Sequence, residues 1–393
     1  MQRLSVLLLF TLAATACGSP VAAPPSGAAR PDPAAVARDL VAGLDSDGDR
    51  ALGPGEADLV LAAGEFRKAD RDGSGRVDTA ELAAFLAGYS SLPASQGVKA
   101  SSLGGVAIGI GIGLTAVTAG YLTYAGLKGA NDVMWPSLNQ STTKPSEIGL
   151  VAEEIVLDAD IKGLKGWYIP AARPTTKAIV FQHGHGGNKS QFLAEFVPWL
   201  RQDYNIVTFD FRGCGESPKA PSSLGYFEAQ EVTAAIALAK ARGNTSIGLM
   251  GFSMGAAASL IAGAQDPSIK AIVEDCSFSD WYHAFHPRIV TKKYPLPAAV
   301  AVAIEKTLEL KLGINAAGAQ PVKFMPRWAG RPVYIIHGDA DAATTPDNAH
   351  LLYAATAEPR TMWLAPGAGH ADSHKVHPQE YERRVLDFFK AAL

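Results

Sequence analysis

The sequence predicts an α/β fold with a mostly parallel central sheet, preceded by a small all-helical module and a membrane-spanning helix. Residues 151–393 carry short apolar stretches, among them 177–182, 205–209 and 332–336, which alternate with helical patterns and glycine-rich turns. Such alternation is typical of parallel strands joined by helices. Upstream of this region lie two acidic loops and a long stretch without charge.

Composition narrows the class of protein. The 393 residues are 48% hydrophobic and 19% charged, with a net charge of −3. That is enough chain for one large core with accessory segments, and the charge balance gives no indication of nucleic-acid binding. The three cysteines, Cys17, Cys214 and Cys276, do not form a disulfide framework. We expect Cys214 and Cys276 to be small buried residues.

The first residues have the pattern of an export signal. Arg3 precedes an apolar core at 4–12, and the small residues 14–16 fit a cleavage site. Cleavage after residue 16 would leave Cys17 first, which resembles a bacterial lipoprotein signal, although Ala14 stands where leucine is preferred. The pattern therefore predicts a lipidated, membrane-associated protein of the bacterial cell envelope. Residues 17–35, rich in Pro, Ala and Gly, are predicted to be a flexible linker.

Residues 36–90 contain a calcium-loop pattern at 70–81. The ligand positions of a twelve-residue EF-hand loop carry oxygen donors here, with Gly75 at the sharp turn and a bidentate carboxylate last. The predicted calcium ligands of this loop are Asp70, Asp72, Ser74, the carbonyl of Arg76, Asp78 through water, and Glu81. Val77 is expected to pack against a partner loop. A solvated acidic turn is the alternative.

A second, weaker loop pattern lies at 45–56. Its predicted calcium ligands are Asp45, Asp47, Asp49, the carbonyl of Ala51, and Glu56. Arg50 replaces the usual glycine, so we expect weaker binding or a distorted loop. Since the two loops are close in sequence, a continuous helix over 56–69 would join them and make them pair atypically.

The stretch 103–127 lacks charge and is long enough to cross a bilayer. Gly105, Gly109 and Gly113 recur at every fourth residue, which suits close helix packing in lipid. We therefore predict a transmembrane helix at 103–127 between linkers at 91–102 and 128–150. A helix buried against protein is the alternative. Lys99 and Lys128 flank the stretch almost symmetrically and leave its orientation open.

Residues 251–255 read Gly-Phe-Ser-Met-Gly between an apolar strand pattern and a small-residue helix pattern. Strand, sharp turn and helix around G-x-S-x-G form a nucleophile elbow, which holds Ser253 at the tip of a strained turn. A serine hydroxyl needs a base to take its proton, so a carboxylate and a histidine are expected downstream. Asp339 or Asp341 and His370 follow the strand patterns at 332–336 and 360–364. An ordinary glycine-rich loop is the alternative.

From 151 to 393 the chain resembles the α/β-hydrolase superfamily, and within it the membrane-anchored serine hydrolases related to serine aminopeptidases and acylglycerol lipases. The resemblance rests on G-x-S-x-G, on His-Gly-x-x-Asp at 337–341, and on Asp-x-Arg-Gly-x-Gly-x-Ser at 210–217. It implies Ser253 as nucleophile, Asp341 rather than Asp339 as acid, and His370 as base. The proline after the acid motif, Pro346, stands one residue later than in the family.

The resemblance leaves rivals for two positions and implies further roles. Some relatives place the acid where Asp275 stands, and His374 and His377 compete with His370. The implied oxyanion hole consists of the backbone N–H groups of His185 and Met254, after the strand at 177–182. Asp210 and Arg212 are implied to brace neighbouring loops, and residues 281–328 to form a lid. Within that lid, 297–312 is a predicted helix with an apolar stripe of Val300, Ile304 and Leu308.

His183 and His185 together raise the alternative of a metal site. No carboxylate or cysteine lies at ligand spacing beside them, so we expect no metal there.

The family resemblance, together with the predicted membrane association, implies a serine hydrolase that cleaves an acyl ester or thioester, lipid esters included, through an acyl-serine intermediate. Calcium is the expected cofactor, bound by the EF-hand segment and not catalytic; the expected partners are a small acyl substrate and a membrane. One alternative is a serine peptidase. Another is a calcium-binding scaffold with an inactive hydrolase fold, which a blocked pocket beside Ser253 would indicate.

Overall fold

The computed structural model describes residues 38, 51–52, 69–72, 74–90, 118, 120–139 and 143–393. Two compact units divide the chain, Met1–Tyr121 and Leu122–Leu393. The predicted export signal, Cys17 and the linkers at 17–35 and 91–102 lie outside the described residues. So do most of the loop at 45–56 and residues 103–117 of the predicted membrane helix. Those assignments stay predictions.

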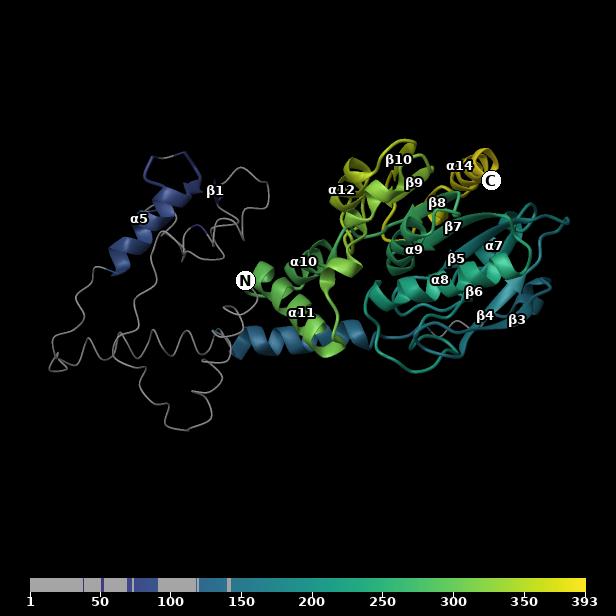
Figure 1. Ribbon diagram of the computed structural model, residues 1–393, viewed down its shortest axis with the longest axis horizontal. Coiled ribbons are helices and arrows are strands. Elements are labelled where there is room, and N and C mark those ends of the chain that lie inside the picture. Colours follow the sequence, from purple (N-terminus) through teal and green to yellow (C-terminus); the bar gives the residue numbers. More distant parts are fainter. Residues whose placement is uncertain are drawn as a thin grey trace. The chain divides into compact units, whose positions relative to one another are not determined.

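An eight-stranded sheet forms the centre of the second unit (Figure 1). Its strand order is β10-β9-β8-β7-β5-β6-β4-β3, with parallel pairing from β10 to β6 and antiparallel pairing of β6 with β4 and of β4 with β3. The strands are β3 (Glu153–Leu157), β4 (Leu164–Ile169), β5 (Lys177–Gln182), β6 (Asn205–Phe209), β7 (Ser246–Phe252), β8 (Ala271–Asp275), β9 (Val333–Gly338) and β10 (Arg360–Ala365). The mostly parallel sheet predicted from the sequence is confirmed.

Helices cover both faces of this sheet. They are α7 (Leu193–Leu200), α8 (Tyr226–Ala241), α9 (Met254–Gln265), α10 (Trp281–Thr291), α11 (Pro297–Leu312), α12 (Asp347–Ala355), α13 (Ser373–Val376) and α14 (Pro378–Ala392), with 3-10 turns η1 (Pro145–Ile148), η2 (Ala316–Ala319), η3 (Pro321–Lys323) and η4 (Met325–Trp328). Phe181 and Met250 pack with Phe196 of α7 and Phe389 of α14 in the main core. Leu249 points to the opposite face, toward α9. The central strands are apolar throughout because both of their faces are covered.

The segment predicted as a lid begins with α10 and α11. Helix α11 has the bounds expected from the sequence, and its stripe of Val300, Ile304 and Leu308 is buried. Residues 120–134 are also helical, and Figure 1 shows that this helix lies beside α11. The close approach depends on glycine: a Cβ on Gly126 would come within 2.9 Å of the carbonyl oxygen of Ala303.

The predicted boundaries at 127, 128 and 151 differ from those of the described residues. Helical residues extend to 134, into the predicted linker, and the compact unit that contains the sheet begins at Leu122. The physical reason is packing: Ala125, Ala130 and Met134 are buried within this unit. No helix in the described part of the chain is long and apolar enough to cross a membrane.

The described part of the first unit is mainly the loop at 70–81 with its flanks, together with a few residues outside it such as 51–52. Strand β1 (Ala51–Leu52) pairs antiparallel with β2 (Val77–Asp78), and α5 (Thr79–Ser90) follows. Leu52 and Val77, the eighth residues of the two predicted loops, are register partners. Val77 is buried, as its expected packing against a partner loop requires. The module is therefore not entirely helical, since a short ladder joins its loops.

Because residues 120–134 pack against α11, replacing glycine by alanine should have different effects on stability at two positions of this helix. Gly126→Ala should destabilise the protein by about 1–3 kcal/mol, because the added methyl group meets the backbone of α11. Gly120→Ala is the matched control: nothing lies within 4 Å of its Cβ position, so it should be neutral or stabilise by up to about 1 kcal/mol. Urea unfolding of the two variants measures both effects. Equal stability of the variants would contradict the packing of this helix.

Candidate active site

Ser253 lies in a sharp turn between β7 and α9. Its backbone angles are φ 52° and ψ −119°, a strained region for a residue with a side chain. The turn is possible because strand and helix nearly touch: a Cβ on Gly251 would lie 2.7 Å from the backbone nitrogen of Ala256. A Cβ on Gly255 would overlap the carbonyl oxygen of His183. Glycine is therefore required on both sides of Ser253, as expected for the elbow.

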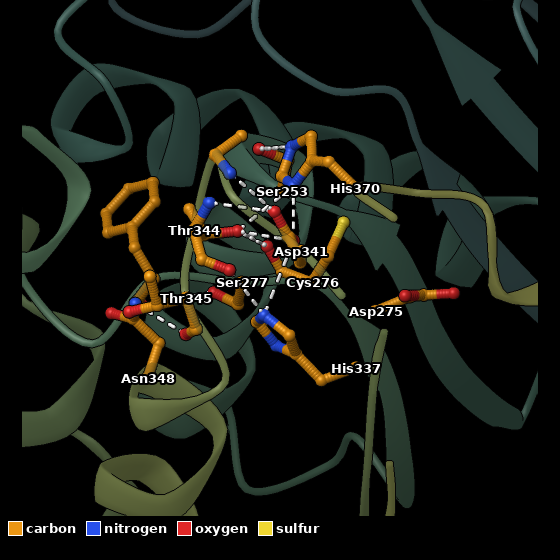
Figure 2. A network of polar contacts seen from close by, with 12 residues as sticks. Ser253, Asp275, Cys276, Ser277, His337, Asp341, Thr344, Thr345, Asn348 and His370 are labelled. Atoms are coloured by element: carbon orange, nitrogen blue, oxygen red, sulfur yellow. Dashed lines mark hydrogen bonds and ion pairs between the residues drawn. The ribbon is translucent and has the colours of Figure 1, made fainter. Parts of the chain in front are cut away.

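Ser253, His370 and Asp341 form one hydrogen-bonded chain (Figure 2). The Nε2 atom of His370 lies 3.1 Å from Ser253 Oγ, and its Nδ1 atom lies 2.7 Å from Asp341 Oδ2. The three residues follow β7, β10 and β9, so the carboxyl edge of the sheet brings them together. This order of contacts lets the imidazole accept the serine proton while the carboxylate orients the ring.

The Asp341 carboxylate is buried but well supplied with donors. Its Oδ1 atom accepts from the backbone N–H groups of Ala343 (2.7 Å) and Thr344 (3.0 Å). Burial raises the pKa of Asp341, but hydrogen bonds from His337 and His370 outweigh burial and hold the pKa well below its ordinary value. A permanently charged carboxylate is what stabilises a histidine that gains a proton during a reaction.

Asp275, the rival acid, points elsewhere. Figure 2 shows its carboxylate apart from the dashed network around His370. Tyr381 donates its hydroxyl to Asp275 Oδ2 at 2.9 Å, and Ser373 lies 3.4 Å from Oδ1. Burial raises the pKa of Asp275 to about 6, although the bond from Tyr381 acts against that shift. In this position the residue ties α14 to the end of β8.

The other rivals also have structural partners. Asp339 accepts from the N–H of Gly367 at 2.6 Å and is exposed. His374 lies between Glu195 and Glu382, and His377 contacts the carbonyl oxygen of Pro366 at 2.7 Å. None of these three contacts Ser253.

The two backbone N–H groups proposed for an oxyanion hole come from His185 and Met254. In the described part of the chain neither N–H donates to a protein acceptor. Both follow strand ends at the same edge, after β5 and β7. The His185 side chain points away from such a role, since its Nε2 atom lies 2.7 Å from the carbonyl oxygen of Val133.

His183 has a structural position that argues against a metal. Its Nδ1 atom lies 2.7 Å from the carbonyl oxygen of Gly184, and its Nε2 atom accepts from the N–H of Phe211. Both ring nitrogens are thus occupied. Neither His183 nor His185 belongs to a group of possible metal ligands among the described residues.

Lys189 is a buried cation that no sequence pattern singles out. Its ammonium group lies 2.7 Å from Asp210 and also pairs with Glu216. Arg212 pairs with the buried Glu231 at 2.6 Å and with Asp160. The Lys189–Asp210 pair joins the loops after β5 and β6, whereas Arg212 ties the loop after β6 to α8 and to the connection between β3 and β4. The loop motif at 210–217 could have suggested a buried partner for Asp210, but not which lysine supplies it.

A cavity of about 310 Å³ lies beside Ser253. Residues from the sheet edge, from α10 and α11, and from the segment 125–137 line it. Backbone hydrogen bonds fix that segment to the site: Ser222 donates to the carbonyl of Met134, and Asn139 donates to that of Gly186. The contribution of 125–137 to the cavity was missed in the sequence, where this stretch was assigned to a membrane helix and a linker.

Comparisons with known proteins agree with this architecture. A family model for the alpha/beta hydrolase fold matches residues 177–296. The esterase Pf2001 of Pyrococcus furiosus has a solved structure that is similar with a TM-score of 0.54 and 21% identity, covering 66% of this chain and 99% of that chain. This chain has the α/β-hydrolase fold.

Similar sequences include uncharacterised bacterial proteins. YfhR of Escherichia coli K12 is 28% identical over 242 residues, which cover 58% of this chain and 77% of YfhR. YqkD of Bacillus subtilis is 26% identical over 230 residues, which cover 57% of this chain and 74% of YqkD. In the α/β-hydrolase fold of the present chain, Ser253 occupies the turn after the central strand β7.

The hydrogen-bond partners of the two buried aspartates predict different effects of the same substitution. Asp341→Asn should lower the turnover of any Ser253-dependent reaction by about three to four orders of magnitude, because the amide no longer stabilises a protonated His370. Asp275→Asn should lower it by less than about tenfold, since the Asp275 carboxylate accepts hydrogen bonds from Tyr381 and Ser373 and not from His370. Steady-state kinetics of both folded variants tests this, and a larger loss in Asp275→Asn would reverse the assignment of the acid.

Proposed function

We propose that this protein is a serine hydrolase that cleaves carboxylic esters. The observation that carries the proposal is the hydrogen-bonded chain from Ser253 through His370 to Asp341. Ser253, at one end of this chain, lies in a strained turn beside a cavity. An inactive scaffold would not need a hydroxyl held 3.1 Å from an imidazole at the mouth of a cavity. The esterase Pf2001, which shares the fold, adds support for an ester substrate.

The proposed reaction has two halves. Ser253 Oγ attacks the ester carbonyl while His370 Nε2 takes its proton, and the negative oxygen of the tetrahedral intermediate accepts from the N–H groups of His185 and Met254. His370 then gives the proton to the leaving alkoxide, which leaves an acyl-Ser253. In the second half, His370 deprotonates a water that attacks this acyl group, and the acid is released. Asp341 holds the Nδ1–H of His370 throughout.

We also propose that the loop at 70–81 binds calcium. Oxygen atoms of Asp70, Asp72 and Glu81 lie within 4.8 Å of one another, which suits a single cation with carboxylate ligands. The Oδ1 atom of Asp70 is buried without a hydrogen-bond partner in the described part of the chain. A buried, unpaired carboxylate oxygen is costly unless a cation occupies the cradle. Ser74 and the carbonyl of Arg76 would complete the set of ligands.

Removing the Ser253 hydroxyl tests the enzymatic proposal. Ser253→Ala should abolish labelling by a fluorophosphonate probe and lower hydrolysis of a 4-nitrophenyl ester by at least about 1,000-fold. The fold should persist, because the change removes one small atom group at a turn tip. Mass spectrometry of the labelled wild-type protein checks the site. Labelling at another serine, or turnover that survives in Ser253→Ala, would refute the proposal.

The calcium proposal is tested by titrating the full chain with calcium in a calorimeter. Glu81→Gln should weaken the tighter site at least about tenfold, because a bidentate carboxylate closes the loop. Arg71→Gln is the control: Arg71 lies in the same loop, is exposed and supplies no ligand in the proposed set. Absence of any binding heat at millimolar calcium in the wild type would contradict the proposal.

A further inference from the structure

Arg288 on α10 lines the cavity beside Ser253. Its Nε atom donates to the carbonyl oxygen of Ala343 at 3.3 Å, two residues after Asp341. Its side chain is exposed to solvent, yet desolvation by surrounding protein lowers the pKa of its guanidinium. Arg288 is thus a solvent-accessible cation in the lining of the cavity.

Among the described residues, the guanidinium of Arg288 has no ion-pair partner, since no Asp or Glu oxygen lies within ion-pair distance of it. Asp132 also lines the cavity, but it pairs with Lys128 at 2.7 Å. Asp341 is near enough to interact electrostatically with Arg288, but its oxygens already accept from His370 and the loop N–H groups. Lys292 adds a further positive charge to the lining.

The chemistry of the guanidinium indicates what it would bind. Arginine presents five N–H donors in a planar fork, and within the part of the chain that the structure describes only the Nε donor of Arg288 has a protein partner. The remaining fork matches a carboxylate in a bidentate arrangement, and such charge-assisted bonds are among the strongest in proteins. The other cavity walls include apolar side chains such as Leu224, Phe278 and Phe285. An apolar pocket with one converging polar group is typical of a substrate site.

We propose that Arg288 binds a carboxylate of the substrate, and that the substrate is a short-chain ester whose cavity-bound part ends in that carboxylate. The proposal rests on the proposed function at Ser253. The cavity of about 310 Å³ is at the lower end of the usual range of ligand pockets, which favours a short chain. Arg288 is then a residue that determines specificity, because it distinguishes an anionic ester from a neutral one of the same shape.

The test compares two esters of nearly equal shape. 4-Nitrophenyl hydrogen glutarate ends in a carboxylate, and 4-nitrophenyl 5-methylhexanoate carries an isopropyl group in its place. For the wild type we expect kcat/KM to be at least about tenfold higher for the glutarate ester, from the worth of one charge-assisted pair. Arg288→Met should lower the ratio of the two kcat/KM values at least about tenfold, and Arg288→Lys should restore part of it.

Arg383→Met is the control, since Arg383 is an exposed residue of α14 that pairs with Asp387. It should leave the ratio unchanged. If Arg288→Met lowers both kcat/KM values equally, or leaves their ratio as it was, the proposal is wrong. A merely structural role of Arg288 would produce the equal loss.

Direct binding separates this proposal from the proposed function. Glutarate should bind to the wild-type protein in a calorimeter, with a Kd at least about tenfold weaker in Arg288→Met. If neither ester is hydrolysed, the esterase proposal fails. The binding of glutarate then decides the role of Arg288 independently of hydrolysis. Absence of glutarate binding, or equal binding by both proteins, overturns the carboxylate site.

Discussion

The close contact between β7 and α9 is the constraint on which the site depends. Gly251 and Gly255 let the strand and helix backbones touch, and the turn between them forces Ser253 to a φ of 52°. Strain of this kind persists only where the surrounding structure fixes it. Here α9 is almost entirely buried, and the backbone N–H of Ser253 donates to the carbonyl of Asp275 at 2.9 Å. The core of the sheet therefore holds the hydroxyl in place before any substrate binds.

Electrostatics then distinguishes the carboxylates at this edge of the sheet. Burial raises the pKa of Glu274 to about 8 and that of Asp275 to about 6. Asp341 is also buried, yet its pKa falls, because donors from His337, His370 and the Thr344 backbone surround it. Hydrogen-bond donors and the charge of His370 thus offset burial at Asp341, whereas burial outweighs the donors at Asp275 and Glu274. A carboxylate that keeps its charge is the one suited to orient His370.

The local part of the site could be predicted from the sequence, because it follows from residue spacing along single strands and turns. The G-x-S-x-G turn required Ser253 at its tip, and the strand patterns placed His370 and two acids at the correct edge. Choosing Asp341 over Asp339 required the family resemblance, which also left Asp275 as a rival, and the hydrogen bonds of the structure then place Asp341 on His370 and Asp275 on Tyr381. Lys189 and Arg288 could not be found in this way. Their roles come from contacts between loops and helices distant in the chain, and no local pattern encodes such contacts.

The stretch up to residue 134 shows a related limit of hydropathy. An apolar segment rich in small residues fits lipid and protein interiors equally well, because both remove the same surface from water. What decides between them is a partner of matching shape. Helix α11 supplies one for residues 120–134, with Ala303 and Ile304 against the faces of Gly126 and Gly129. Residues of the 120–134 helix, and the residues that follow it up to 137, also line the cavity beside Ser253. Small side chains in this stretch thus allow α11 to approach closely, and that approach forms one wall of the cavity beside Ser253.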